Sequence, residues 1–171
     1  MSATNWEPTS TPSKREAAIL KRLTRTKKLF AFLRLHRSTI FDDAFQAELA
    51  GMYRASEAGK SPVAPALLAM ATLLQAYTGA SDAEAVELSL MDARWQMVLD
   101  NLEGDAPAFS QGALSSFRQR LIAHDMDRRL LERTVEVARK FDEFDPKKLG
   151  KLKIAVDSRP LTGAGRVQDT I

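Results

Sequence analysis

Apolar residues recur at three- and four-residue spacing along most of the chain, and this spacing predicts α-helices. Between Lys14 and His36 one helical stripe is mainly apolar and the opposite stripe is basic. The first stripe contains Ile19, Leu23, Thr26, Phe30 and Leu33, and the second contains Lys14, Lys21, Arg25 and Lys28. We expect one long helix here, with a row of cations suited to phosphate groups, after a flexible Pro-, Ser- and Thr-rich leader over residues 1–13.

Start and stop signals divide the middle of the chain into further helices. Asp42 and Asp43 are typical of a helix N-terminus, and we expect that helix to run towards Glu57. Ser61 as N-cap and Pro62 at the first helical position predict a central core helix, which the glycine at position 79 should end.

The next region has the layout of a helix-turn-helix variant. Ser81 and Glu84 have capping-box spacing, and a break is expected near Asp92. A loop over residues 100–109 precedes Ser110, which should cap a helix with Leu114, Phe117 and Leu121 on its apolar side. The other sides of this helix carry Gln111, Ser115, Arg118 and Gln119, where they could contact base edges in a major groove. The connection is longer than the usual three or four residues, so an ordinary surface helix is the alternative.

The end of the chain combines a last helix with a short strand pattern. A helix from about Asp127 to Phe144 carries cations that are available to phosphate, namely Arg128, Arg129, Arg133, Arg139 and Lys140. The alternating run Lys151–Val156 predicts one β-strand that ends at Asp157. The predicted fold is all-α: a helical bundle over residues 14–145 with a helix-turn-helix-like portion, followed by one short strand within residues 146–171.

Charge is segregated along the 171 residues, although the net charge is only +3. Residues 1–40 hold nine basic and two acidic side chains, residues 41–110 hold three and eleven, and residues 111–171 hold thirteen and nine. Basic ends around an acidic middle favour a polyanion partner, while solvated helix faces are the alternative. No apolar run approaches twenty residues, so no membrane partner is expected and the cytoplasm is the default location.

Independent enzymatic chemistry has little support in the sequence. The chain has no cysteine, which excludes disulfides and thiol nucleophiles. His36 and His124 lie on separate segments without a triad pattern, and surface or capping roles are expected for them. We find no zinc spacing, phosphate-binding loop or nucleophile elbow.

Several motifs in a fixed order resemble a known family. They are Phe41 to Phe45, Gly59 to Pro62, Tyr77 to Gly79, Ser81 with Asp82 and Glu84, Trp95, Leu114 to Leu121, and Ile154 to Ser158. Together they are similar to the N-terminal helical region of bacterial insertion-sequence transposases of the InsH type. The resemblance covers roughly residues 40–171 and implies binding of double-stranded DNA at the terminal inverted repeats of a transposon.

The same resemblance implies how the complete enzyme would work. In this family an RNase H-like core holds divalent metal, Mg²⁺, with three acidic residues, and Asp157 resembles the first of them. One carboxylate cannot hold that metal site, so we expect a fragment that binds DNA, has no cofactor of its own and does not cut. A turn residue before Pro160 is the alternative for Asp157. The DNA-binding residues are expected to be Lys14, Lys21, Arg25, Lys28, Gln111, Ser115, Arg118, Gln119 and Arg120.

A different class of function also stays open. The acidic middle and an unpaired strand edge would suit a protein-interaction module that forms a homodimer or pairs with full-length transposase as a truncated regulator.

Overall fold

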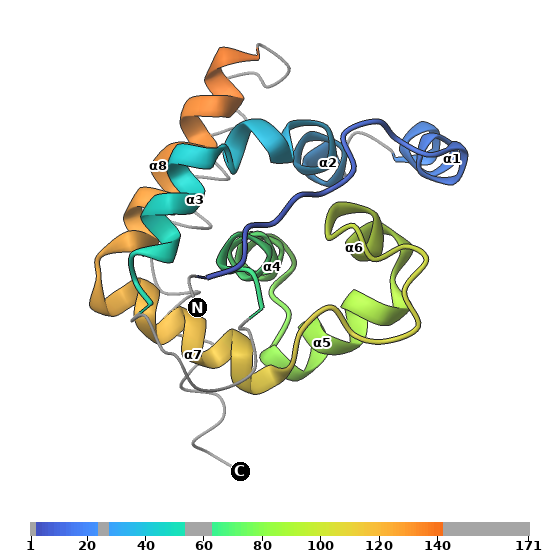
Figure 1. Cartoon of the computed structure of the whole chain (residues 1–171). Coiled ribbons are helices and arrows are strands. Elements are labelled where there is room, and N and C mark those ends of the chain that lie inside the picture. Colours follow the sequence, from blue (N-terminus) through green and yellow to red (C-terminus); the bar gives the residue numbers. More distant parts are fainter. Residues whose placement is uncertain (1–2, 24–27, 54–62, 142–171) are drawn as a thin grey trace.

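The computed structural model describes residues 3–23, 28–53 and 63–141, and this part of the chain is all-helical, as predicted. Figure 1 shows the arrangement of its eight helices. They are α1 (Lys14–Arg22), α2 (Lys28–Ile40), α3 (Asp43–Ala50), α4 (Pro65–Thr78), α5 (Asp82–Met91), α6 (Ala93–Val98), α7 (Gln111–Ala123) and α8 (Met126–Lys140). The predicted strand at Lys151–Val156 and the boundary near residue 146 lie outside the described residues.

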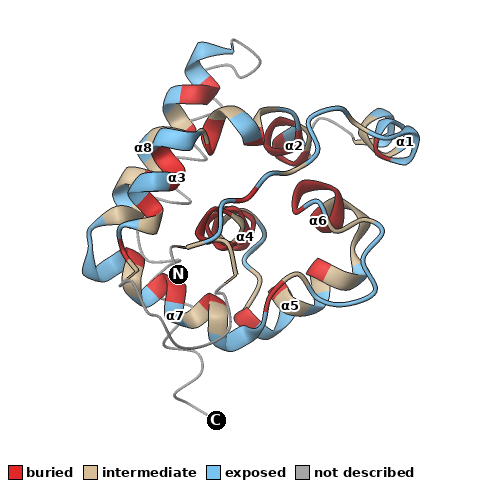
Figure 2. Ribbon diagram, in the orientation of Figure 1, coloured by how far each residue is buried: buried red, intermediate tan, exposed pale blue. Residues whose placement is uncertain are grey.

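Helix α4 forms the centre of the bundle. Figure 1 shows it end-on with the other helices around it, and Figure 2 shows it buried on nearly every side. Leu68, Met70 and Leu74 are almost fully inaccessible to solvent. The core assignment is confirmed, as is the stop at Gly79, which adopts a left-handed conformation with φ 74°. The predicted start is wrong, because α4 begins at Pro65 with Ala64 as its N-cap. Ser61 and Pro62 themselves lie outside the described residues.

The expected single helix from Lys14 to His36 is in fact two helices. Helix α1 ends before Leu23, whose backbone is extended, and α2 begins at Lys28. An ion pair joins the two helices, with Arg34 Nε and Glu16 Oε1 2.6 Å apart. In one continuous helix these two residues would lie about 27 Å apart, so the pair requires the chain to change direction.

The N-terminal segment packs onto the bundle, where we had expected a flexible leader. The ring of Trp6 is buried and meets Phe41 edge-on, with the ring centroids 5.9 Å apart. The Trp6 backbone N–H donates to Gln46 Oε1 at 2.7 Å, and Gln46 Nε2 donates to the Trp6 carbonyl at 2.9 Å. Residues 3–13 therefore belong to the folded domain.

The shorter helices begin where capping chemistry predicts. The carboxylate of Asp42 accepts from the backbone of Phe45, and Ser81 forms a capping box with Glu84. Asp92 separates α5 from α6, as expected. Helix α3 is shorter than predicted and ends at Ala50, seven positions before Glu57 in the sequence. Glu57 lies outside the described residues. In the described part of the chain no helix is both long and apolar enough to span a membrane.

Candidate nucleic-acid interface

Helix α7 is fixed in the bundle by its apolar side. Ser110 Oγ accepts from the backbone N–H of Ala113, so the helix begins where the sequence predicts. Leu114, Phe117 and Leu121 are fully buried, as expected, and α7 packs against α4, α5 and α8. The opposite side of α7 therefore faces away from the core.

Arg118 is not on the outer side of α7, and its predicted role at base edges is wrong. Its guanidinium donates to Asp82 Oδ1 at 2.7 Å and to Oδ2 at 2.6 Å, and both side chains are buried. Gln75 Nε2 donates to the same carboxylate at 2.9 Å. Burial raises the pKa of Asp82, but the hydrogen bonds from Arg118 and Gln75 outweigh it and leave that pKa below its ordinary value. Through these hydrogen bonds the Arg118 side chain links α7 to α5 and α4.

The outer face of α7 is mainly polar and small, with the exposed side chain of Ile122 at its C-terminal end. Gln111, Ser116 and Gln119 are exposed, and Ser115 is half-buried. Gly112 lies on the same face, and a Cβ built there would meet nothing within 4 Å. No acidic residue occurs between Gln111 and Ala123. The outer face of α7, defined here as Gln111, Gly112, Ser115, Ser116 and Gln119, can therefore approach a polyanion closely.

Arg120 lies at the flank of this face. Its guanidinium carbon stands 4.6 Å from the ring centroid of Tyr53, which is a cation–π distance. Burial raises the pKa of Tyr53, although the charge of Arg120 opposes that shift. The Arg120 side chain is half-buried, and stacking on the Tyr53 ring sets the position of its guanidinium.

The basic residues predicted at the N-terminus lie on elements other than α7. Lys14 and Lys21 are exposed on α1, and Lys28 is exposed at the start of α2. Figure 1 shows α1 and α7 on opposite sides of the domain. Because the single long helix does not form, these cations do not make one continuous row, and Arg25 lies outside the described residues.

Two of the arginines expected to face phosphate from α8 have structural partners. Arg129 Nε donates to Glu48 at 3.0 Å, and its guanidinium lies over the ring of Phe45. Arg133 donates to the carbonyls of Thr39 and Ile40 and pairs with Asp42 at 2.6 Å. Arg128, Arg139 and Lys140 are exposed.

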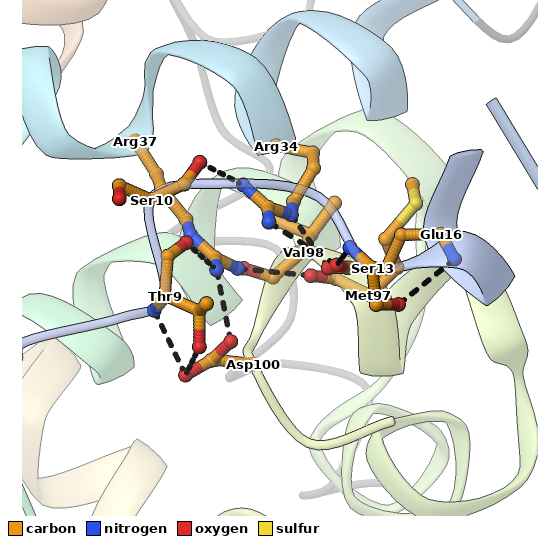
Figure 3. A network of polar contacts seen from close by, with 9 residues as sticks. All are labelled: Thr9, Ser10, Ser13, Glu16, Arg34, Arg37, Met97, Val98 and Asp100. Atoms are coloured by element: carbon orange, nitrogen blue, oxygen red, sulfur yellow. Dashed lines mark hydrogen bonds and ion pairs between the residues drawn. The ribbon is translucent and has the colours of Figure 1, made fainter. Parts of the chain in front are cut away.

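A buried polar network, shown in Figure 3, was not predicted from the sequence. Arg34 binds Glu16, while Arg37 donates to the carbonyls of Met97 and Val98 and to Asp100. Burial raises the pKa of Glu16, but the hydrogen bond from Arg34 overcomes this and holds the pKa below its ordinary value. The sequence offers no local signal for these contacts, because the partners lie 18 to 63 residues apart.

The predicted metal ligand cannot be compared with the structure. Asp157, the expected first catalytic acid and metal ligand, lies beyond the described residues. Among the residues that are described, no group of three His, Asp or Glu side chains could hold a metal ion.

Comparison of the sequence with known protein families gives a match. A family model described as a transposase domain, DUF772, matches residues 19–120. The matched region begins within α1 and extends to the next-to-last turn of α7. The chain belongs to this transposase domain family, which indicates a role related to transposition. Searches of curated proteins and of solved structures find no match.

Proposed function

We propose that this domain binds duplex DNA at the terminal inverted repeats of a transposon, with the outer face of α7 in the major groove. The observation that carries the proposal is that face itself: exposed Gln111 and Gln119, a close-approach position at Gly112 and no carboxylate. A recognition helix needs this combination, because base edges are read by polar side chains while phosphates repel acidic ones. The family membership supplies the biological setting.

Affinity and specificity are assigned to different surfaces. Lys14, Lys21 and Lys28 are exposed cations that suit contacts with phosphate independent of sequence. Arg120, held against Tyr53, suits a phosphate beside the groove that α7 occupies. Since α1 and α7 lie on opposite sides of the domain, the α1 cations would contact a different stretch of DNA from the one that α7 reads.

A gel-shift titration tests this proposal. The full chain is titrated with a duplex that carries the terminal repeat of the element encoding it and with a scrambled duplex of the same composition. We expect the repeat to bind at least about 10³-fold more tightly at physiological salt. Equal affinities would defeat the proposal.

The closer assignment, to DDE transposases of the InsH type, belongs to the same proposal. It draws on the resemblance of the motifs between Phe41 and Ser158. In a complete enzyme of this type Asp157 would be one of three carboxylates that hold Mg²⁺. We expect the present chain to bind DNA without cutting it. Metal-dependent nicking by the purified chain that disappears in Asp157→Ala would contradict this expectation.

Pairing with another protein chain is the second candidate function. Among the described residues, the exposed large apolar side chains are Leu35, Met91, Ile122 and Phe141. They belong to α2, α5, α7 and the residue after α8, and α2 contacts α8. An exposed apolar patch is typical of a protein interface. Light scattering distinguishes the two functions: a monomer at high concentration agrees with DNA binding alone, and a stable dimer would favour pairing.

A further inference from the structure

The glutamines in the described part of the chain fall into two groups. Gln46, Gln75 and Gln96 are buried, and each donates through Nε2 to a partner inside the domain. Gln111 and Gln119 are exposed, and their amides have no hydrogen-bond partner among the described residues. Both of these exposed carboxamides belong to the outer face of α7.

The spacing of the two side chains suits a groove. They are eight residues apart on one helix, which corresponds to about 12 Å along the axis. Because stacked base pairs rise by about 3.4 Å, this distance spans three to four base pairs. The residues between them on that face are Gly112, Ser115 and Ser116, which are small enough not to hold α7 away from the bases.

The chemistry of this face selects among the bases. A carboxamide can donate to N7 or accept from N6 of adenine, and glutamine makes both bonds at once. Guanine is read best by arginine, but Arg118 is turned inward to Asp82 and Arg120 stacks on Tyr53. Cytosine is read by carboxylates, and α7 has none.

We propose that Gln111 and Gln119 read adenines of two A·T base pairs, three to four base pairs apart, in the major groove of the transposon end. The proposal rests on the proposed function, since it requires α7 to enter DNA. It adds the identity and the spacing of the bases that this face recognises.

Selection from a randomised duplex library tests the base identity. The full chain and its Gln111→Ala and Gln119→Ala variants are each used to enrich duplexes, and the preferred bases are determined. For the parent chain we expect two A·T positions three to four base pairs apart. Each variant should lose the preference at one of them, with a five- to 150-fold fall in discrimination. Gln119→Arg should convert its position to a preference for guanine.

An atomic substitution in the DNA separates groove contact from indirect effects. Replacing adenine by 7-deazaadenine at the Gln119 position removes the N7 acceptor and leaves the Watson–Crick edge unchanged. Binding by the parent chain should weaken, whereas binding by Gln119→Ala should not change further. Both glutamines are exposed, so thermal unfolding of the variants should match that of the parent chain.

The possible outcomes distinguish a failure of the glutamine assignment from a failure of the proposed DNA-binding function. If no duplex is enriched, both the DNA-binding function and the glutamine assignment fail. If duplexes are enriched but the glutamine variants select the same bases as the parent chain, DNA binding stands and the assignment to Gln111 and Gln119 is wrong. Enrichment of G·C pairs at both positions also overturns the assignment.

Discussion

The guanidinium of Arg118 makes two hydrogen bonds, of 2.7 and 2.6 Å, to the carboxylate of Asp82, and both groups are buried. Arg118 precedes Gln119 directly, and one residue corresponds to about 100° around a helix. Fixing Arg118 against α5 therefore fixes the direction in which the exposed side of α7 points. The ion pair between Arg118 and Asp82 therefore sets the orientation of the outer face of α7.

Removing one residue of the Arg118–Asp82 ion pair should destabilise the domain strongly. Arg118→Ala leaves the Asp82 carboxylate buried without its main partner, and we expect the free energy of unfolding to fall by about 3–5 kcal/mol. Urea denaturation monitored by circular dichroism measures the change.

A double-mutant cycle provides the control for that prediction. Arg118→Ala combined with Asp82→Ala removes both charges, so the combined loss should be clearly smaller than the sum of the two single losses. Strict additivity would show that the two side chains do not stabilise each other.

Lowering the pH should reduce the stability of the domain because its buried carboxylates become protonated. The pKa values of Asp82 and Glu16 are both lowered in the folded state. A lowered folded-state pKa gives stability that is complete above the unfolded-state pKa and is lost as the pH falls through the folded-state value. We therefore expect the free energy of unfolding to be constant down to about pH 5 and to fall below about pH 4. Asp82→Asn should show a smaller fall on acidification, and an identical pH profile would refute this origin.

Loss of the Trp6 ring should cost as much as loss of a core residue. The ring is buried against Phe41, so Trp6→Ala should lower the free energy of unfolding by about 3 kcal/mol or more. Thermal denaturation compares it with Asn5→Ala, a neighbouring exposed residue that should have almost no effect. A leader that does not pack would make the two variants equally stable.

The α1 cations should control the salt dependence of DNA binding. If Lys21 contacts a phosphate, Lys21→Ala should reduce the magnitude of the slope of log K against log salt concentration by about 0.9. Lys21→Arg keeps the charge and should leave that slope unchanged. Binding to a scrambled duplex at several salt concentrations gives both values, and an unchanged slope in Lys21→Ala removes this residue from the interface.

Local signals predicted the helices well, whereas the roles of the charged residues needed the fold. Ser81, Asp92 and Ser110 act within three residues of themselves, so capping chemistry placed those helix ends correctly. The break between α1 and α2 brings Glu16 and Arg34 together as an ion pair, a contact that no periodicity reveals.

The candidate site residues also divide into those that local sequence patterns predict and those whose role depends on contacts distant in sequence. The helical pattern correctly placed Gln111 and Gln119 on the solvent side of α7, because burial follows from periodicity. It failed for Arg118, since a buried arginine is tolerated only where a distant carboxylate satisfies it. Ser116 belongs to the same exposed face and was recognisable from the periodicity, while Tyr53 stacks on Arg120 through a contact far apart in sequence.

Affinity cleavage of DNA tests the central claim most directly, namely that the outer face of α7 lies against DNA. The chain has no cysteine, so Ser116→Cys creates a unique attachment point for an iron–EDTA group on α7, and Ser38→Cys provides a matched exposed serine on α2. With the terminal-repeat duplex we predict localised cleavage from the position 116 conjugate and little from the position 38 conjugate. Cleavage from position 38 with none from position 116 would contradict the account.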